Sequence, residues 1–168
     1  MHSESDQHAN NDCHPRQAWM GLLARSPLPL LESGLAPYLP AEFQWLRRPE
    51  TGLMMVQGRA GGTGERFNLG EITVTRCTLR LSQTGTGAKV GVSYVIGRSQ
   101  RHAQLAAIAD ALLQDLSLIG ALEVGLLEPI RRHLAAEQAR RQQRAQSTRV
   151  DFLTLAREAR GELTDERL

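Results

Sequence analysis

A cluster of glycines between two arginines is the first segment whose residue types could do chemistry. Glycine tolerates positive φ, and consecutive backbone N–H groups in such turns can form an anion-binding nest. The segment lacks the Gly-Lys-Ser/Thr ending of a phosphate-binding P-loop, so a glycine-rich hairpin connection is the alternative. The candidate anion-binding or interface residues here are Arg59, Gly61, Gly62, Thr63, Gly64, Glu65 and Arg66.

Three further residues could contribute to an anionic site or to an interface. Arg76 follows Thr75 where the apolar alternation of a long strand changes parity, so it points either into a cleft or into solvent. Arg98 and His102 lie at the start of a predicted helix, where the helix dipole favours anions. His102 is a candidate acid/base or phosphate ligand, or else a boundary histidine on an Ala-rich face.

The sequence shows no complete catalytic constellation. It contains no nucleophile elbow, no paired carboxylates at useful spacing, and no CxxC or HExxH motif. Cys13 and Cys77 form neither a disulfide framework nor a metal motif. We therefore predict no metal site and no cofactor held by this chain, and we do not expect it to act as an enzyme alone.

The spacing of apolar residues along the chain changes between the helix period and the strand period, and it predicts the elements that position these residues. Short amphipathic helices are predicted over residues 16–25 and 28–39, and four strands over residues 43–48, 52–59, 67–82 and 90–96. Ser99 is a good N-cap for a helix whose apolar stripe contains Leu105, Ile108, Leu112 and Leu116. The predicted fold is α+β, a four-stranded, mostly antiparallel sheet covered by helices on one face.

The C-terminal part is predicted to be an extended helical arm. Residues 135–149 read AAEQARRQQRAQSTR, which offers no large apolar side chain for a core, and an apolar cluster follows. Something must cover that cluster, and a second chain is the economical answer. The predicted organisation is a disordered leader at 1–14, an α+β domain at 15–128 and a docking arm at 129–168. The predicted docking residues are Arg149, Val150, Asp151, Phe152 and Leu153.

Charge is distributed unevenly although the formal net charge is only +2. Residues 131–149 contain six Arg and one Glu, whereas residues 110–128 contain four acids and no base. This asymmetry indicates docking surfaces, although a nucleic-acid-binding module that uses the basic helix is a rival, and a stand-alone enzyme is another. The polar leader does not read as a secretion signal, and no stretch is long and apolar enough for a membrane span, so we expect a cytoplasmic protein.

The same segments resemble the PhnG family, the small subunit of the bacterial carbon–phosphorus lyase core complex. The resemblance covers about residues 15–160. The matching residues are Glu50-Thr51-Gly52-Leu53, the run from Arg59 to Phe67, Gly70, Thr73, Thr75-Arg76, Arg80-Leu81, Tyr94, Gly97-Arg98, His102-Ala103, Asp110-Ala111-Leu112 and Arg149-Val150-Asp151-Phe152. Ser99 stands where the family has Asp, and Leu153 stands where a second aromatic often follows.

The resemblance implies a role in phosphonate catabolism. It implies a complex that transfers ribose 5-triphosphate from ATP to a phosphonate and releases adenine, with ATP as the substrate of the complex. The implied partners are larger PhnI-, PhnH-, PhnJ- and PhnL-like subunits, and the PhnI-like subunit is the usual candidate for the nucleosidase chemistry. The resemblance does not imply nucleic acid or membrane as a partner.

Overall fold

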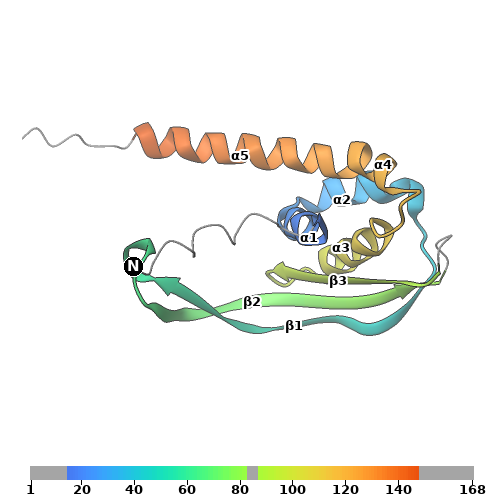
Figure 1. Cartoon of the computed structure of the whole chain (residues 1–168), viewed down its shortest axis with the longest axis horizontal. Coiled ribbons are helices and arrows are strands. Elements are labelled where there is room, and N and C mark those ends of the chain that lie inside the picture. The colour runs from blue at the N-terminus through green and yellow to red at the C-terminus, as the bar shows by residue number, and fades with distance from the viewer. Residues whose placement is uncertain (1–14, 83–86, 148–168) are drawn as a thin grey trace, which may run out of the picture.

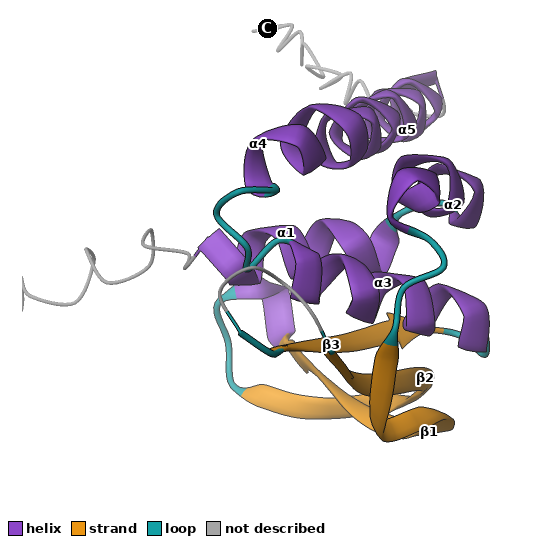
Figure 2. Cartoon of the chain, turned by 90° about the vertical axis from the view of Figure 1, so that its right-hand side faces the viewer, coloured by secondary structure: helices purple, strands orange, loops and turns teal. Residues whose placement is uncertain are grey.

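The computed structural model describes residues 15–82 and 87–147, and within them the helices lie on one side of an antiparallel sheet (Figure 1). A view along the sheet shows the strands as one layer with α3 against it and α2, α4 and α5 further out (Figure 2), and α1 also contacts β3. The elements are α1 (Pro15–Arg25), α2 (Leu28–Leu35), η1 (Ala36–Tyr38), β1 (Phe43–Arg59), η2 (Ala60–Gly62), β2 (Arg66–Leu81), β3 (Lys89–Ile96), α3 (Gln100–Leu112), α4 (Ile119–Leu122), the π-helical turn η3 (Glu123–Leu127) and α5 (Glu128–Ser147).

The α+β class and the antiparallel meander are confirmed, but the prediction of four strands is wrong. The sheet has three strands in the order β1-β2-β3, because the two strands expected on either side of Pro49 form one continuous β1. Pro49 lies at an irregularity between Arg47 and Glu50 on an outer strand. A proline there removes no hydrogen bond from the middle of a sheet, so the strand continues past it.

The core lies between the sheet and α3. Alternate side chains of β2, including Cys77, Leu79 and Leu81, are buried, as are Leu105 and Ile108 on α3. Side chains that alternate in this way belong to one face of the sheet, so β2 packs this face onto the helices. The predicted stripe on α3 ends early, since α3 stops at Leu112 and Leu116 beyond it is 84% exposed.

Local signals explain the start of α3 and the unusual middle of β2. The Ser99 hydroxyl accepts a hydrogen bond from the backbone N–H of His102 at 3.2 Å, which confirms the predicted N-cap. Val74 and Thr75 are both buried although they face opposite sides of β2. The change in apolar alternation near Thr75 therefore reflects a strand that is buried on both faces. It is not a bulge against β3, because the register between β2 and β3 is unbroken.

β1 and β2 extend well beyond β3. Only Val74–Leu81 of β2 pairs with β3, so residues 53–59 and 66–73 form a two-stranded ribbon with no third strand in the described part of the chain; its base receives one hydrogen bond, from the N–H of Gly97 to the carbonyl of Thr73. At about 3.3 Å per residue, the ribbon projects roughly 25 Å past the three-stranded sheet. We refer to these two segments as the ribbon.

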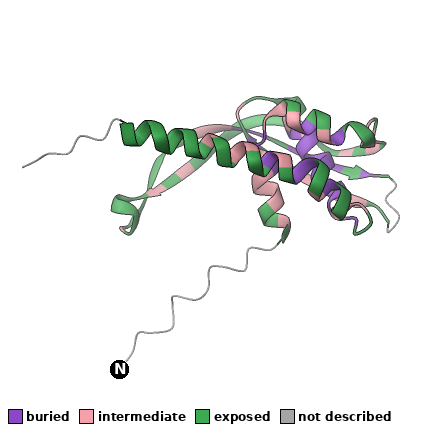
Figure 3. Ribbon diagram, turned by 90° about the horizontal axis from the view of Figure 1, so that it is seen from above, coloured by how far each residue is buried: buried purple, intermediate pink, exposed green. Residues whose placement is uncertain are grey.

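The predicted helical arm is present as α5, and the structure describes it to Ser147. Ile130 is buried and Leu134 is half-buried, but every residue from Gln138 to Ser147 is exposed (Figure 3). A helix that is polar on all sides gains little from packing against its own domain. The predicted docking residues 149–153 and the leader lie outside the described residues.

Candidate functional site

The glycine cluster forms the tip of the β1–β2 hairpin. Gly61 and Gly62 have φ values of 61° and 83°, a conformation that favours glycine. Arg59 and Arg66 lie directly opposite each other in the ladder, and both line a shallow hollow with Thr63, Gly64 and Glu65. The predicted flanking of the loop by two guanidinium groups is therefore present. The N–H of Gly64 already donates to the carbonyl of Ala60 at 2.8 Å, and Arg59 donates to the carbonyl of Gly64 at 3.3 Å.

Arg76 lies on the face of the sheet that points away from the helices. Its Nε donates to Oε1 of Glu50 at 2.6 Å, and Arg47 approaches the same oxygen at 3.5 Å. Two guanidinium groups thus share one carboxylate, which leaves the cluster cationic. Arg76 also borders a hollow of about 140 Å³ with Tyr94, so its position beside a small cleft is observed.

Arg98 and His102 lie just after the C-terminal end of β3, where α3 begins. The Arg98 side chain is exposed, whereas His102 is half-buried. The ring Nε2 of His102 lies 2.9 Å from the carbonyl oxygen of Leu23, which requires the ring to donate its proton there. This hydrogen bond ties α3 to the end of α1 and gives His102 a structural function.

The structure does not gather the predicted anion-binding residues into one site. Arg66 and Arg76 are ten residues apart on one strand, which corresponds to about 33 Å. The hairpin tip is consequently remote from the Arg76 cluster, whereas the start of α3 lies nearer to that cluster, since Tyr94 pairs with Arg76 and Thr75 Oγ1 donates to the carbonyl of Gly97 at 2.7 Å. In the described part of the chain, no group of three His, Cys, Asp or Glu side chains is placed to hold a metal ion.

A buried aspartate is a feature that the candidate set missed. Asp110 is fully buried on α3 and accepts hydrogen bonds from Arg16, Trp19 and the backbone N–H of Val92. The hydrogen bonds to this carboxylate raise the pKa of the Arg16 guanidinium. The cluster joins α1, β3 and α3 at one point, so it positions the helices against the sheet. In the sequence, the signal for this cluster was a single acidic residue within an otherwise apolar stripe of a predicted helix.

The ribbon presents an apolar face that points away from the helices. Met54 lies opposite Ile72, and Phe67 lies opposite Gly58, where the side chain of Leu69 also packs. Met54 and Phe67 are about half exposed, at 48% and 47%, and Leu69 is 62% exposed. Exposed apolar side chains that lie next to one another in this way mark an interaction surface.

The apolar face continues onto the three-stranded sheet through Tyr94 and Ile96, which are 50% and 73% exposed. The uncovered face is defined by the side chains of Met54, Val56, Phe67, Leu69, Ile72, Tyr94 and Ile96. No helix of the described residues packs on it (Figure 2). This face, with the cationic cluster of Arg47 and Arg76 beside it, is the most extensive candidate interface in the described structure.

The positive charge of the basic helix α5 is partly neutralised by acids of α5 itself and of the preceding turn η3. Arg131 pairs with Glu123 and Glu128, and Arg141 donates to Glu137 at 2.6 Å. These pairs reduce the cationic character that a nucleic-acid-binding surface would need. None of the described helices is long and apolar enough to cross a membrane.

Comparisons with known proteins identify the relatives of this chain. Residues 14–158 match the family described as "Phosphonate metabolism protein PhnG". A curated protein of Rhizobium meliloti (strain 1021) is 46% identical over 112 residues, which is 67% of this chain and 69% of that protein. That relative is named alpha-D-ribose 1-methylphosphonate 5-triphosphate synthase subunit PhnG. The matched range includes the hairpin tip, the ribbon and the Asp110 cluster.

Proposed function

The chain belongs to the PhnG family of phosphonate metabolism proteins, and we propose that it is a docking subunit of a ribose 1-phosphonate 5-triphosphate synthase. In this proposal the complex transfers ribose 5-triphosphate from ATP to a phosphonate and releases adenine. The chain supports this reaction by holding larger subunits in place. The partners we propose are the PhnI-, PhnH-, PhnJ- and PhnL-like subunits.

The observation that carries the proposal is the uncovered face. A monomer rarely leaves so continuous a row of apolar side chains in water, because their burial is favourable by about 25 cal/mol per Å². The ribbon exposes Leu53 and Met55 on its other face as well, at 67% and 48%. A two-stranded ribbon is marginally stable alone, so a partner that covers both faces would also stabilise it.

The anion-binding candidates have a more limited function in this proposal. Because the hairpin tip lies far along β2 from Arg76, it contributes separately from Arg76 at the boundary with a partner. Arg76 and Arg47 at the uncovered face supply positive charge beside the docked subunit. There the two guanidinium groups favour the binding of a triphosphate whose main contacts come from that subunit.

Co-expression with the other subunits tests the proposed function. We expect one stable hetero-oligomer by size-exclusion chromatography with light scattering, and ATP- and methylphosphonate-dependent release of adenine. The same subunits prepared without this chain should assemble poorly and lose activity. A fully active, fully assembled complex that lacks this chain would contradict the proposal, as would adenine release by this chain alone.

A further inference from the structure

The outer edge of β3 is closed over its first half by side chains. The carbonyl of Val90 accepts hydrogen bonds from Arg16 Nη2 at 3.2 Å and from Gln114 Nε2 at 2.8 Å. The N–H of Val92 donates to Oδ2 of Asp110 at 2.9 Å. These contacts satisfy the main chain where an edge strand would otherwise be open.

The second half of the same edge is open. The main-chain N–H and C=O groups of an antiparallel strand point alternately to its two sides. The N–H and C=O of Tyr94 therefore point to the outer edge, as those of Val90 and Val92 do. The opposite parity faces β2, as shown by the N–H of Gly97, which donates to the carbonyl of Thr73 at 2.9 Å. None of the hydrogen bonds among the described residues uses the outward N–H or C=O of Tyr94.

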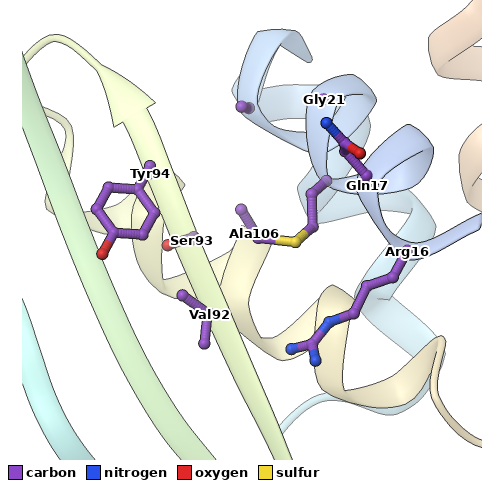
Figure 4. A pocket seen from close by; sticks show the side chains of 9 residues that line it. Arg16, Gln17, Gly21, Val92, Ser93, Tyr94 and Ala106 are labelled. Carbon is purple, nitrogen blue, oxygen red and sulfur yellow. The ribbon is translucent and has the colours of Figure 1, made fainter. Parts of the chain in front are cut away.

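A groove of about 740 Å³ lies beside this open edge, between β3 and α1 (Figure 4). Its helical wall is lined by Met20, Gly21 and Ala24 of α1 and by Ala106 of α3, and its other wall by Val92, Ser93 and Tyr94. Small side chains along the helical wall leave room next to the strand. The groove therefore offers apolar space beside unpaired main-chain groups, which is the combination that an added β-strand uses.

The exposed charges beside the groove are cationic, since the Asp110 carboxylate is fully buried and already paired with Arg16. Neither α1 nor β3 contains an acidic residue. Arg25 ends α1 next to the groove residue Ala24, and Arg98 follows the end of β3. An occupant with carboxylates toward this end would meet complementary charge.

We propose that the open edge of β3 accepts an extended acidic–apolar segment of a partner subunit, which adds to the sheet as a further strand. The inference rests on the proposed function, because it assigns one contact within the same assembly. The segment exchanges hydrogen bonds with the main chain of Tyr94 and places an apolar side chain against Met20 and Ala106. A second copy of this chain is a poorer occupant, since Arg16, Asp110 and Gln114 already occupy the other half of the edge.

Two substitutions of one residue separate a main-chain contact from a side-chain contact. Tyr94→Pro removes the outward N–H, and proline is tolerated on an edge strand where that N–H faces away from the sheet. Tyr94→Ala keeps the N–H and removes the ring from the uncovered face. Each variant is co-expressed with the other subunits, and the melting temperature of each isolated variant reports on its fold.

In the assembled complex we expect Tyr94→Pro to weaken subunit binding roughly tenfold or more relative to Tyr94→Ala, which corresponds to one lost main-chain hydrogen bond and its strand register. We also expect slow amide hydrogen exchange at Tyr94 in the wild-type complex and fast exchange in the isolated chain. Equal binding by the two variants, in a wild-type complex that still forms, would overturn the inference while leaving the proposed function intact.

Two other results would assign the edge to a different occupant and overturn the inference. Slow amide exchange at Tyr94 in the isolated chain, together with a dimer mass by light scattering, would identify a second copy as the occupant. Protection in an isolated monomer that disappears when residues 1–14 or 148–168 are removed would identify a segment of this chain. Failure of the wild-type chain to assemble with any partner would instead contradict the proposed function.

Discussion

Arg16 and Asp110 are joined by a two-point contact, with Nε 3.1 Å from Oδ1 and Nη2 2.8 Å from Oδ2. The Asp110 side chain is fully buried whereas that of Arg16 is 38% exposed. Trp19 Nε1 donates to Oδ1 at 2.9 Å, so one carboxylate satisfies donors from two residues of α1 as well as from β3. The pair therefore fixes the start of α1 against the edge of the sheet.

Asp110→Ala should destabilise the isolated domain by about 3 kcal/mol, because it leaves the Trp19 N–H and the Val92 N–H without their acceptor. The loss should appear as a lower midpoint in urea denaturation. Arg16→Ala should cost about 1 kcal/mol, since the guanidinium is partly exposed and the carboxylate keeps two other donors. Equal effects of the two substitutions would show that the ion pair, not the set of hydrogen bonds, holds α1.

Gly91→Ala should destabilise the fold by about 3 kcal/mol or more, because the added methyl group meets backbone. A Cβ at Gly91 would lie 1.8 Å from the carbonyl oxygen of Ala107, so β3 and α3 would have to move apart. Gly52→Ala is a matched control, since a Cβ there meets nothing within 4 Å. Thermal unfolding of both variants checks the prediction, and a Gly91→Ala protein as stable as Gly52→Ala would contradict the packing of β3 on α3.

Cys77 should make stability fall at alkaline pH. Its side chain is completely buried, and burial raises the pKa of the thiol to about 11. Between the ordinary thiol pKa and this value the unfolded chain loses the proton while the folded chain keeps it, so the free energy of unfolding decreases as pH rises.

The measurement is urea denaturation at pH 7 and at pH 11, which should show a Cys77-dependent loss of about 2 kcal/mol. Cys77→Ala lacks the titrating group, so its stability should change less over the same range, although it is less stable at pH 7 because of the cavity. Parallel pH profiles for the two proteins would mean that the thiol is not held protonated in the folded state.

Arg76→Ala should weaken ATP binding by the intact complex and leave assembly unchanged. The Arg76–Glu50 pair is half-exposed on both sides, so its loss should change stability by less than about 1 kcal/mol. Arg80→Ala removes a cation from the same face of β2, four residues along, and should have less effect on ATP binding. Isothermal titration with ATP compares the two variants, and unchanged affinity in Arg76→Ala would leave this arginine a structural function only.

Local sequence patterns predicted the elements whose signals are local. The alternation of Val90, Val92, Tyr94 and Ile96 predicted β3, and Ser99 predicted the start of α3. The polar run after Leu134 predicted a helical stretch without core contacts, and residues 138–147 of α5 are all exposed. Pro49 was misleading because its effect depends on whether the strand is at an edge, a property of the sheet and not of the segment.

The arrangement of the candidate residues could not be predicted in this way. From the sequence alone, Arg66 and Arg76 could belong to one site, but both lie on the continuous strand β2, which keeps them far apart. The hydrogen bonds of Asp110 depend on how α1 packs beside β3, with partners 91 and 94 residues away in the sequence. The open edge of β3 likewise follows from strand order. Each of these features is set by tertiary packing, and the spacing of residues along the chain does not predict that packing.

Phe67→Glu should prevent or strongly weaken assembly without affecting the fold. Phe67 is 47% exposed in the isolated chain, so a charge there should change its stability by only about 0.5 kcal/mol. In a complex the same carboxylate would be buried against apolar groups, and the subunit dissociation constant should rise about 100-fold or more. Gln100→Glu adds the same charge at the exposed start of α3 and should assemble normally. Size-exclusion chromatography of the co-expressed subunits measures both variants, and normal assembly by Phe67→Glu would remove the ribbon from the interface.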